Sequence, residues 1–222
     1  MKEVESAGGG LKGVRRAAGI SWGGWVYGNG DLNRENVVKR IFQELYLGEK
    51  FNSYYRLEPL FYRKRGLYLQ EKLLIPREIL FSLKKNLRLG IASGRPRFEA
   101  ELALKRFRLL SYFDSMVTLD ECNEEEARVL HTTRKRVKYS KPDPYSLLRV
   151  VEEIGIPDPR CGYVGDVVDD MLAARASKKK LNMLAVGFLR GRGKVETMKD
   201  SLLRAGADLL IQSPRELLRL TL

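Results

Sequence analysis

The stretch Gly165-Asp166-Val167-Val168-Asp169-Asp170 decides the fold of this chain. It follows Cys161-Gly162-Tyr163-Val164, a short apolar run that predicts a buried strand, and it opens a helical pattern. Asp166 therefore ends a strand, and Asp169 and Asp170 enter the first turn of the next helix. Carboxylates placed in this way can converge on one Mg²⁺, a cation that prefers oxygen ligands. The alternative is that Asp166 caps the helix while the other two complement its dipole.

The chain on either side of this stretch alternates between short apolar runs and amphipathic helical stretches. We expect strands near residues 87–92, 115–119, 161–166, 181–188 and 208–211. This alternation predicts an α/β fold, a Rossmann-like parallel sheet with helices on both faces. Between the second and third strands, residues 121–140 are strongly charged, and there we expect a loop or flap. Ligands of such sheets bind at the carboxyl ends of the strands, where Ser93 and Asp166 both stand.

The region before the predicted sheet differs in its composition and in the spacing of its apolar residues. Residues 1–32 are rich in glycine and show no clear apolar period, so we expect loop or weak order there. From Asn33, which can cap a helix, apolar residues recur at three- and four-residue steps. We therefore expect a small helical lobe over residues 33–85, with further helical stretches at 49–65 and 67–85, and the α/β core over residues 86–222.

Composition narrows the class of protein. The 222 residues are 44% hydrophobic, enough to bury a core in one large domain or in a domain with an accessory lobe. No apolar run approaches the roughly 20 residues of a membrane span. No apolar stretch follows the first six residues, so we do not expect a signal peptide. Cys122 and Cys161 need no disulfide framework, so we expect a cytoplasmic protein with packing cysteines. The net charge of +13 is scattered over short clusters, so nucleic acid remains only an alternative partner.

Two further segments carry groups that suit a phosphate. Ser93-Gly94-Arg95 follows a strand and precedes a helix, where a hydroxyl and backbone N–H groups can bind an anion. A serine cap with a glycine turn is the alternative there. Lys141 opens Lys141-Pro142-Asp143-Pro144 before a helix, and an ammonium group at such a place neutralises charge in phosphoryl transfer. An ordinary solvated lysine is the alternative. His131, the single histidine, is expected at the surface.

The order of these segments along the chain resembles that of the haloacid dehalogenase-like superfamily. The similarity spans about residues 86–222 and reaches Ala207-Asp208-Leu209-Leu210-Ile211, which looks like the last strand of such phosphatases. The resemblance implies a Mg²⁺-dependent phosphatase whose preceding helical lobe is a cap that closes over the substrate. It also implies a small phosphorylated metabolite as substrate, similar to phosphoglycolate or a sugar phosphate, and a monomer or homodimer.

The resemblance also implies a role for each site residue. Ser93, with Gly94 and Arg95, binds the transferring phosphoryl group, and Ser93 donates a hydrogen bond to it. Lys141 bridges that group and the nucleophile. Asp166 and Asp170 of the stretch at 165–170 are the Mg²⁺ ligands, and Asp169 supports them.

One motif that the resemblance requires is missing. Such enzymes attack phosphate with an aspartate of an Asp-x-Asp motif, at the end of the first and central strand, and its partner is the general acid and base. Before Ser93 the sequence holds only Asp31, with no apolar strand in front of it. We weigh a shortened form, whose first strand precedes Met1, against a catalytically silent relative that binds phosphate or a partner. Loss of a central strand leaves its neighbours unpaired, which is costly and favours the first explanation.

Overall fold

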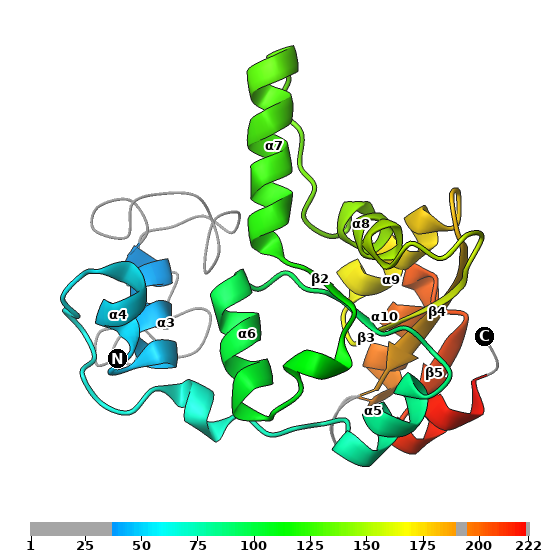
Figure 1. Cartoon of the computed structure of the whole chain (residues 1–222), viewed down its shortest axis with the longest axis horizontal. Coiled ribbons are helices and arrows are strands. Elements are labelled where there is room, and N and C mark those ends of the chain that lie inside the picture. The colour runs from blue at the N-terminus through cyan, green and yellow to red at the C-terminus, as the bar shows by residue number, and fades with distance from the viewer. Residues whose placement is uncertain (1–36, 190–194, 221–222) are drawn as a thin grey trace. The chain divides into compact units, whose positions relative to one another are not determined.

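The chain divides into two compact units, and the boundary along the sequence lies between Lys72 and Leu73. The computed structural model describes residues 37–189 and 195–220, drawn in colour in Figure 1. The glycine-rich segment 1–32, for which we expected loop or weak order, lies outside the described residues. Each unit is described by itself below.

The first unit consists of short helices joined by a loop. Its elements are helices α3 (Val37–Leu47) and α4 (Phe51–Tyr55) and a 3₁₀ turn, η1 (Leu67–Gln70). The buried Glu44 of α3 accepts hydrogen bonds from the backbone N–H groups of Leu60, Phe61 and Tyr62, at 2.9, 2.6 and 3.0 Å. Those contacts hold the chain after α4 in a non-helical course. The helix expected over residues 49–65 is therefore wrong beyond the short α4.

The second unit alternates helices with strands, as the sequence predicts. Its elements in chain order are α5 (Arg77–Lys84), β1 (Gly90–Ala92), α6 (Arg97–Arg106), η2 (Leu110–Tyr112), β2 (Ser115–Val117), α7 (Leu119–Thr133), α8 (Tyr145–Ile154), β3 (Arg160–Gly165), α9 (Val168–Ser177), β4 (Asn182–Phe188), α10 (Val195–Ala205), β5 (Leu209–Ile211) and η3 (Pro214–Arg219). Strands occur at all five expected places, and every strand pair is parallel. The α/β class is confirmed.

The five strands form two sheets instead of one. One sheet is β1-β2, with Ala92 opposite Val117, and the other is β3-β4-β5, with Gly165 opposite Gly187. Among the described residues no strand pairs with the second edge of β1 or of β3. The sheet is therefore interrupted between two strands whose carboxyl ends carry site residues.

Helices cover both faces of the three-stranded sheet. Alternate residues of β4 point to opposite sides. Met183 and Ala185 join a core with residues of α9 and α10, whereas Val186 joins a second core with Leu217 of η3 and Leu83 of α5. Because α5 packs in this way, it belongs to the second unit and not to the helical lobe in which the sequence pattern grouped it.

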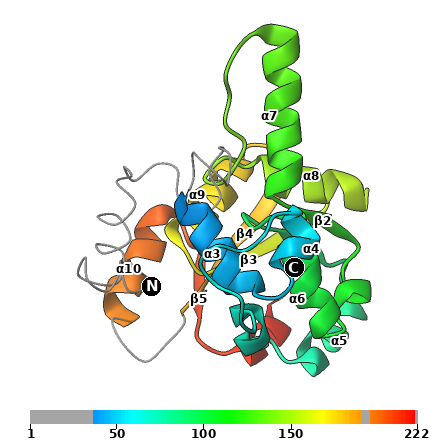
Figure 2. The ribbon, with the colours of Figure 1, turned by 90° about the vertical axis from the view of Figure 1, so that its left-hand side faces the viewer.

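Helix α7 occupies the first part of the segment 121–140, for which we expected a loop or flap. That expectation is wrong for residues 121–133, whereas residues 134–140 form neither helix nor strand, as expected. The helix begins at a capping box: the Thr118 hydroxyl accepts from Asp120 N, and the Glu121 side chain accepts from Thr118 N. The helix extends away from the sheets, as Figures 1 and 2 both show, and its C-terminal residues 130–133 are exposed, so its sequence is polar. None of the described helices combines the length and the hydropathy that a bilayer crossing requires.

Candidate functional site

Near the carboxyl ends of β1 and β3, two of the residues that the sequence placed in a phosphate site, Lys141 and Asp170, lie in contact. Lys141 Nζ, which reaches this edge from the turn before α8, donates to Asp170 Oδ1 at 2.5 Å, to Tyr163 Oη at 2.8 Å and to the Ala92 carbonyl oxygen at 3.2 Å. Two residues predicted from separate motifs, Lys141 and Asp170, are thus in direct contact. Their side chains are 16% and 7% exposed, so the ion pair is largely removed from water.

Asp170 points inward because of its position in the first turn of α9. Its Oδ2 accepts from the backbone N–H groups of Asp166 and Val167, at 3.2 and 3.4 Å, so it satisfies donors that the helix start leaves unpaired. Gly165 makes this possible: a Cβ at that position would lie 2.3 Å from Asp170 Cβ. Both oxygens of Asp170 therefore already accept hydrogen bonds from within the chain.

The three acidic residues of the opening stretch differ in exposure. Asp170 is buried, Asp166 is partly exposed and Asp169 is exposed. Among residues 37–189 and 195–220, no group of three or more Asp, Glu, His or Cys side chains is placed to hold a metal ion. A donor set with Asp166 foremost still fits Mg²⁺, because that ion keeps several waters and is commonly bound by one or two carboxylates together with substrate phosphate.

The Ser93 loop lies at the end of β1. Ser93 N donates to the Val117 carbonyl oxygen at 2.9 Å, which extends the β1–β2 pairing by one residue. Ser93 Oγ accepts from Arg95 N at 3.1 Å within the turn, but the N-cap residue of α6 is Pro96, so Ser93 is not the helix cap of the alternative interpretation. A Cβ built on Gly94 would meet nothing within 4 Å, so there is open space beside this turn.

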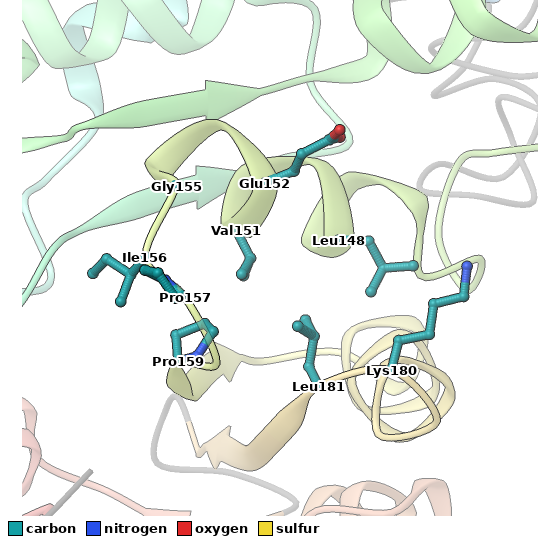
Figure 3. Close-up of a pocket in the computed structure, with 9 residues that line it drawn as sticks. All are labelled: Leu148, Val151, Glu152, Gly155, Ile156, Pro157, Pro159, Lys180 and Leu181. Atoms are coloured by element: carbon teal, nitrogen blue, oxygen red, sulfur yellow. The ribbon is translucent and has the colours of Figure 1, made fainter.

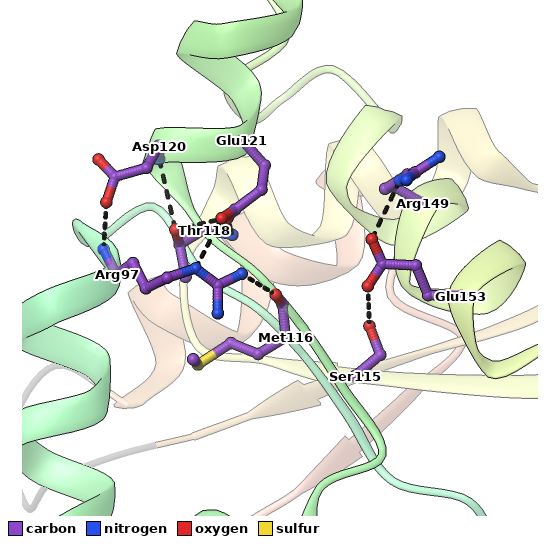
Figure 4. Close-up of polar contacts among 8 residues, drawn as sticks. All are labelled: Arg97, Ser115, Met116, Thr118, Asp120, Glu121, Arg149 and Glu153. Atoms are coloured by element: carbon purple, nitrogen blue, oxygen red, sulfur yellow. Dashed lines mark hydrogen bonds and ion pairs between the residues drawn. The ribbon is translucent and has the colours of Figure 1, made fainter.

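A network around Arg97 fixes the same loop to the start of α7 (Figure 4). Arg97 donates through Nη2 to the Met116 carbonyl oxygen and through Nε to Glu121 Oε1, both at 2.6 Å, and its backbone N donates to Asp120 Oδ2 at 2.7 Å. Burial raises the pKa of Glu121, but hydrogen bonds from Arg97 and Thr118 outweigh it, so the pKa lies below its usual value. The Glu121 carboxylate therefore stays charged and holds β2, α6 and α7 together.

A second contact in Figure 4 joins α8 to β2. Ser115 Oγ donates to Glu153 Oε2 at 2.7 Å, and Arg149 Nε donates to Glu153 Oε1 at 3.0 Å. The helix that follows Lys141 is thereby attached to the two-stranded sheet. Lys141 is consequently positioned by both sheets: through α8 on the β2 side and through Tyr163 on the β3 side.

Sequence reasoning missed Tyr163 and the Arg97 network. Tyr163 stands in an apolar strand, where a tyrosine looks like a core residue. Removal of its hydroxyl from water, and then the neighbouring Asp170 carboxylate, raise the pKa of Tyr163 well above 10, so the hydroxyl stays protonated. The Thr118-x-x-Glu121 spacing is a signal of a helix start in the sequence, and it could have identified Glu121.

The remaining singled-out residues lie away from this site. His131 is exposed on α7, as expected. Cys122 is buried, and burial, followed by the nearby Glu126, raises the pKa of its thiol to about 11. A thiol of that kind is protonated at neutral pH and is a poor nucleophile. Both cysteines are free.

A hollow of about 500 Å³ lies between α8 and the amino ends of two strands (Figure 3). Its lining includes Leu148 and Val151 of α8, Pro159 before β3, and Leu181 before β4. This is the edge of the sheet opposite to Lys141. Because ligands of parallel sheets bind at the carboxyl ends, we do not assign the hollow to the phosphate site.

Comparison with known proteins relates the chain to a family of hydrolases and to two phosphatases. The family model described as haloacid dehalogenase-like hydrolase matches residues 76–184. The N-acetylmuramic acid 6-phosphate phosphatase of Pseudomonas aeruginosa is 29% identical over 146 residues, which are 64% of this chain and 53% of that protein. The phosphorylated carbohydrates phosphatase of Thermotoga maritima is 30% identical over 140 residues, or 62% and 53%. The chain thus spans about half the length of the curated relatives it matches.

A solved structure shows the fold. A hydrolase from Pseudomonas syringae aligns with a TM-score of 0.53 and 24% identity, over 93% of this chain and 85% of that one. The matched residues include Ser93, Lys141 and the acidic stretch at 165–170, the segments whose order suggested the family. Residues 76–184 therefore match the haloacid dehalogenase-like hydrolase family.

Proposed function

We propose that this chain is the phosphate-handling part of a Mg²⁺-dependent phosphatase that acts on a small phosphomonoester such as a sugar phosphate. The observation that carries the proposal is the contact of Lys141 Nζ with both Asp170 and the Ala92 carbonyl oxygen, which precedes the Ser93 loop, near the carboxyl ends of β1 and β3. The names of two relatives, phosphatases of N-acetylmuramic acid 6-phosphate and of phosphorylated carbohydrates, support this class of substrate.

In this proposal each site residue handles the phosphoryl group or its charge. Bound Mg²⁺ supplies positive charge for the phosphoryl oxygens, and Asp166, with Asp170 and Asp169 behind it, holds that ion. Lys141 adds a second positive charge at the same edge, where it offsets the charge of the phosphoryl group. The Ser93 hydroxyl and the backbone N–H groups of the Ser93-Gly94-Arg95 turn bind its remaining oxygens. The helical unit before Leu73 serves as the cap.

The nucleophile is the part that we propose for a longer form of the chain. Strands β1 and β3 carry the site residues but belong to different sheets, and within the described residues the facing edge of each lacks a strand partner. A position between them suits one more parallel strand, and an Asp-x-Asp at its end would lie beside Lys141. Unpaired strand edges are costly, which supports a shortened form whose first strand precedes Met1.

The test is phosphate release from a panel of sugar phosphates by the upstream-extended protein with Mg²⁺. We expect Asp166→Asn to lower turnover at least 100-fold and its matched control, Asp158→Asn, to leave turnover unchanged. Asp158 is exposed and has a φ of 43°, which asparagine adopts readily. Unchanged turnover in Asp166→Asn would rule out the proposed metal site. Absence of an apolar run ending in Asp-x-Asp upstream of Met1 would rule out the shortened form.

A second candidate function is phosphate or partner binding without catalysis. One observation favours it: all three hydrogen-bond donors of the Lys141 ammonium group and both oxygens of Asp170 are already used within the chain. Binding of Mg²⁺ and phosphate by the extended protein, with no turnover of any phosphomonoester, would support this alternative.

A further inference from the structure

The Tyr163 hydroxyl lies at the centre of the contacts that surround Lys141. It accepts from Lys141 Nζ at 2.8 Å, and it lies 3.0 Å from Asp170 Oδ1 and 3.2 Å from the Ala92 carbonyl oxygen. Because the hydroxyl has one proton, it donates to one of these two oxygens at a time. The four groups come from β1, the turn before α8, β3 and α9, so this one hydroxyl touches every element that forms the edge.

The Tyr163 hydroxyl supplies one of the hydrogen-bond acceptors of the Lys141 ammonium group. A lysine ammonium group has three N–H donors, and Lys141 directs them to three acceptors, the Ala92 carbonyl, the Tyr163 hydroxyl and Asp170. A phenylalanine at position 163 would keep the ring in the core of β3 and β4. It would remove one of the three acceptors and leave the ammonium group free to turn about its side-chain bonds.

We propose that Tyr163 is a positioning residue for phosphate binding, whose hydroxyl fixes the direction of the Lys141 ammonium group against Asp170 and Ala92. It acts through Lys141 and not on the phosphoryl group. This role rests on the proposed function, because it concerns phosphate binding. The effect of Tyr163 on Lys141 can still be measured without phosphate. Packing of the ring and the hydrogen bonds of the hydroxyl are separable, because only the second disappears in Tyr163→Phe.

The experiment compares the present chain with Tyr163→Phe and with a matched control, Tyr145→Phe. Tyr145 lies in the same unit, with its ring against Tyr139, and takes no part in the Lys141 contacts. Acylation of Lys141 by acetic anhydride, followed by peptide mass spectrometry, should be several-fold faster in Tyr163→Phe and unchanged in Tyr145→Phe. Affinity for inorganic phosphate with Mg²⁺, measured by calorimetry, should fall about five- to tenfold, the worth of one hydrogen bond.

The outcomes separate a positioning role from a structural one. If Tyr163→Phe lowers the unfolding midpoint but leaves both the Lys141 acylation rate and the phosphate affinity unchanged, the hydroxyl serves only stability and the proposal is overturned. If neither the parent chain nor its upstream-extended form binds phosphate, the proposed function fails, while the acylation rate still decides the role of Tyr163. Asp170→Asn, which keeps the shape of the side chain, provides a second variant: it should also speed acylation of Lys141, and an unchanged rate there would contradict the proposed cluster.

Discussion

At the scale of single residues, the ion pair between Lys141 and Asp170 dominates the site. Both charges are largely withdrawn from water, and each is surrounded by hydrogen-bond partners. A buried pair contributes little net stability, since desolvation offsets the attraction, but removal of one partner leaves an uncompensated charge. The pair therefore acts mainly as a geometric constraint on the site.

Lys141→Met should test this asymmetry. We expect the variant to lower the free energy of unfolding of the second unit by about 3–5 kcal/mol, because Asp170 stays buried without its cation. Urea denaturation followed by circular dichroism measures the change. The double variant with Asp170→Asn should recover much of the loss, and Lys135→Met, at an exposed position, serves as the control. A double variant no more stable than Lys141→Met would contradict this account.

The sequence predicted these residues because their order along the chain mirrors a family pattern. The contact between Lys141 and Asp170 follows from two local motifs meeting at one sheet edge. Tyr163 could not be predicted in the same way, because its hydroxyl reaches a carbonyl oxygen 71 positions earlier, at Ala92. A local apolar pattern does not show which side-chain tip will lie beside which distant backbone group.

At the scale of elements, α7 shows where periodicity fails. Its sequence lacks an apolar stripe, so hydrophobic periodicity predicts a loop. The helix depends instead on its N-terminal cap, where Glu121 accepts from the Thr118 backbone N and hydroxyl and from Arg97. A capping signal of this kind consists of two residues, so hydrophobic periodicity does not detect it.

Glu121→Ala should therefore weaken more than one helix. We expect a loss of about 2 kcal/mol, since the substitution removes a helix cap and leaves Arg97 without its carboxylate. The urea midpoint of the second unit reports it. Glu125→Ala is the matched control, because Glu125 pairs only with Arg128 across one turn of the same helix. That control should leave the midpoint unchanged, and equal losses in the two variants would refute the role given to Glu121.

At the scale of the whole molecule, the two units differ in what they bury. The second has two apolar cores around β4, whereas the first buries the Glu44 carboxylate in addition to apolar side chains such as Leu47 and Phe51. The unit boundary at Lys72 could not be predicted from the helical pattern over residues 33–85. It depends on α5 packing against the distant η3, a contact that local sequence does not encode.

The stability of the first unit should depend on acid pH. Burial raises the pKa of Glu44, but hydrogen bonds from Leu60, Arg40, Phe61 and Tyr62 outweigh it, so the pKa lies below 4.5. Its folded pKa is thus below the unfolded value, and the stability it contributes is present above pH 4.5 and is lost as the pH falls through the folded pKa. Calorimetry between pH 3 and 7 should show one transition moving down in temperature more steeply than the other.

Glu44→Gln separates this effect from general acid unfolding. The variant should destabilise the first unit at pH 7 and flatten its dependence on pH below 4.5, because glutamine does not titrate. Glu49→Gln, at an exposed position beyond the end of α3, is the control and should change neither. An unchanged pH dependence in Glu44→Gln would show that other carboxylates govern the acid transition.

The interruption between β1 and β3 also has a consequence for amide hydrogen exchange. In a continuous sheet the strands nearest the middle exchange most slowly, and here β1 and β3 would be those strands. Among the strands of residues 37–189 and 195–220, only β4 has a strand on each side, so its amides should exchange slowest. Alternate amides of β1 and β3, those that face the interruption, should exchange orders of magnitude faster. Mass spectrometry of exchange would thus outline the position of one further strand as a line of fast amides through the middle of a slow core.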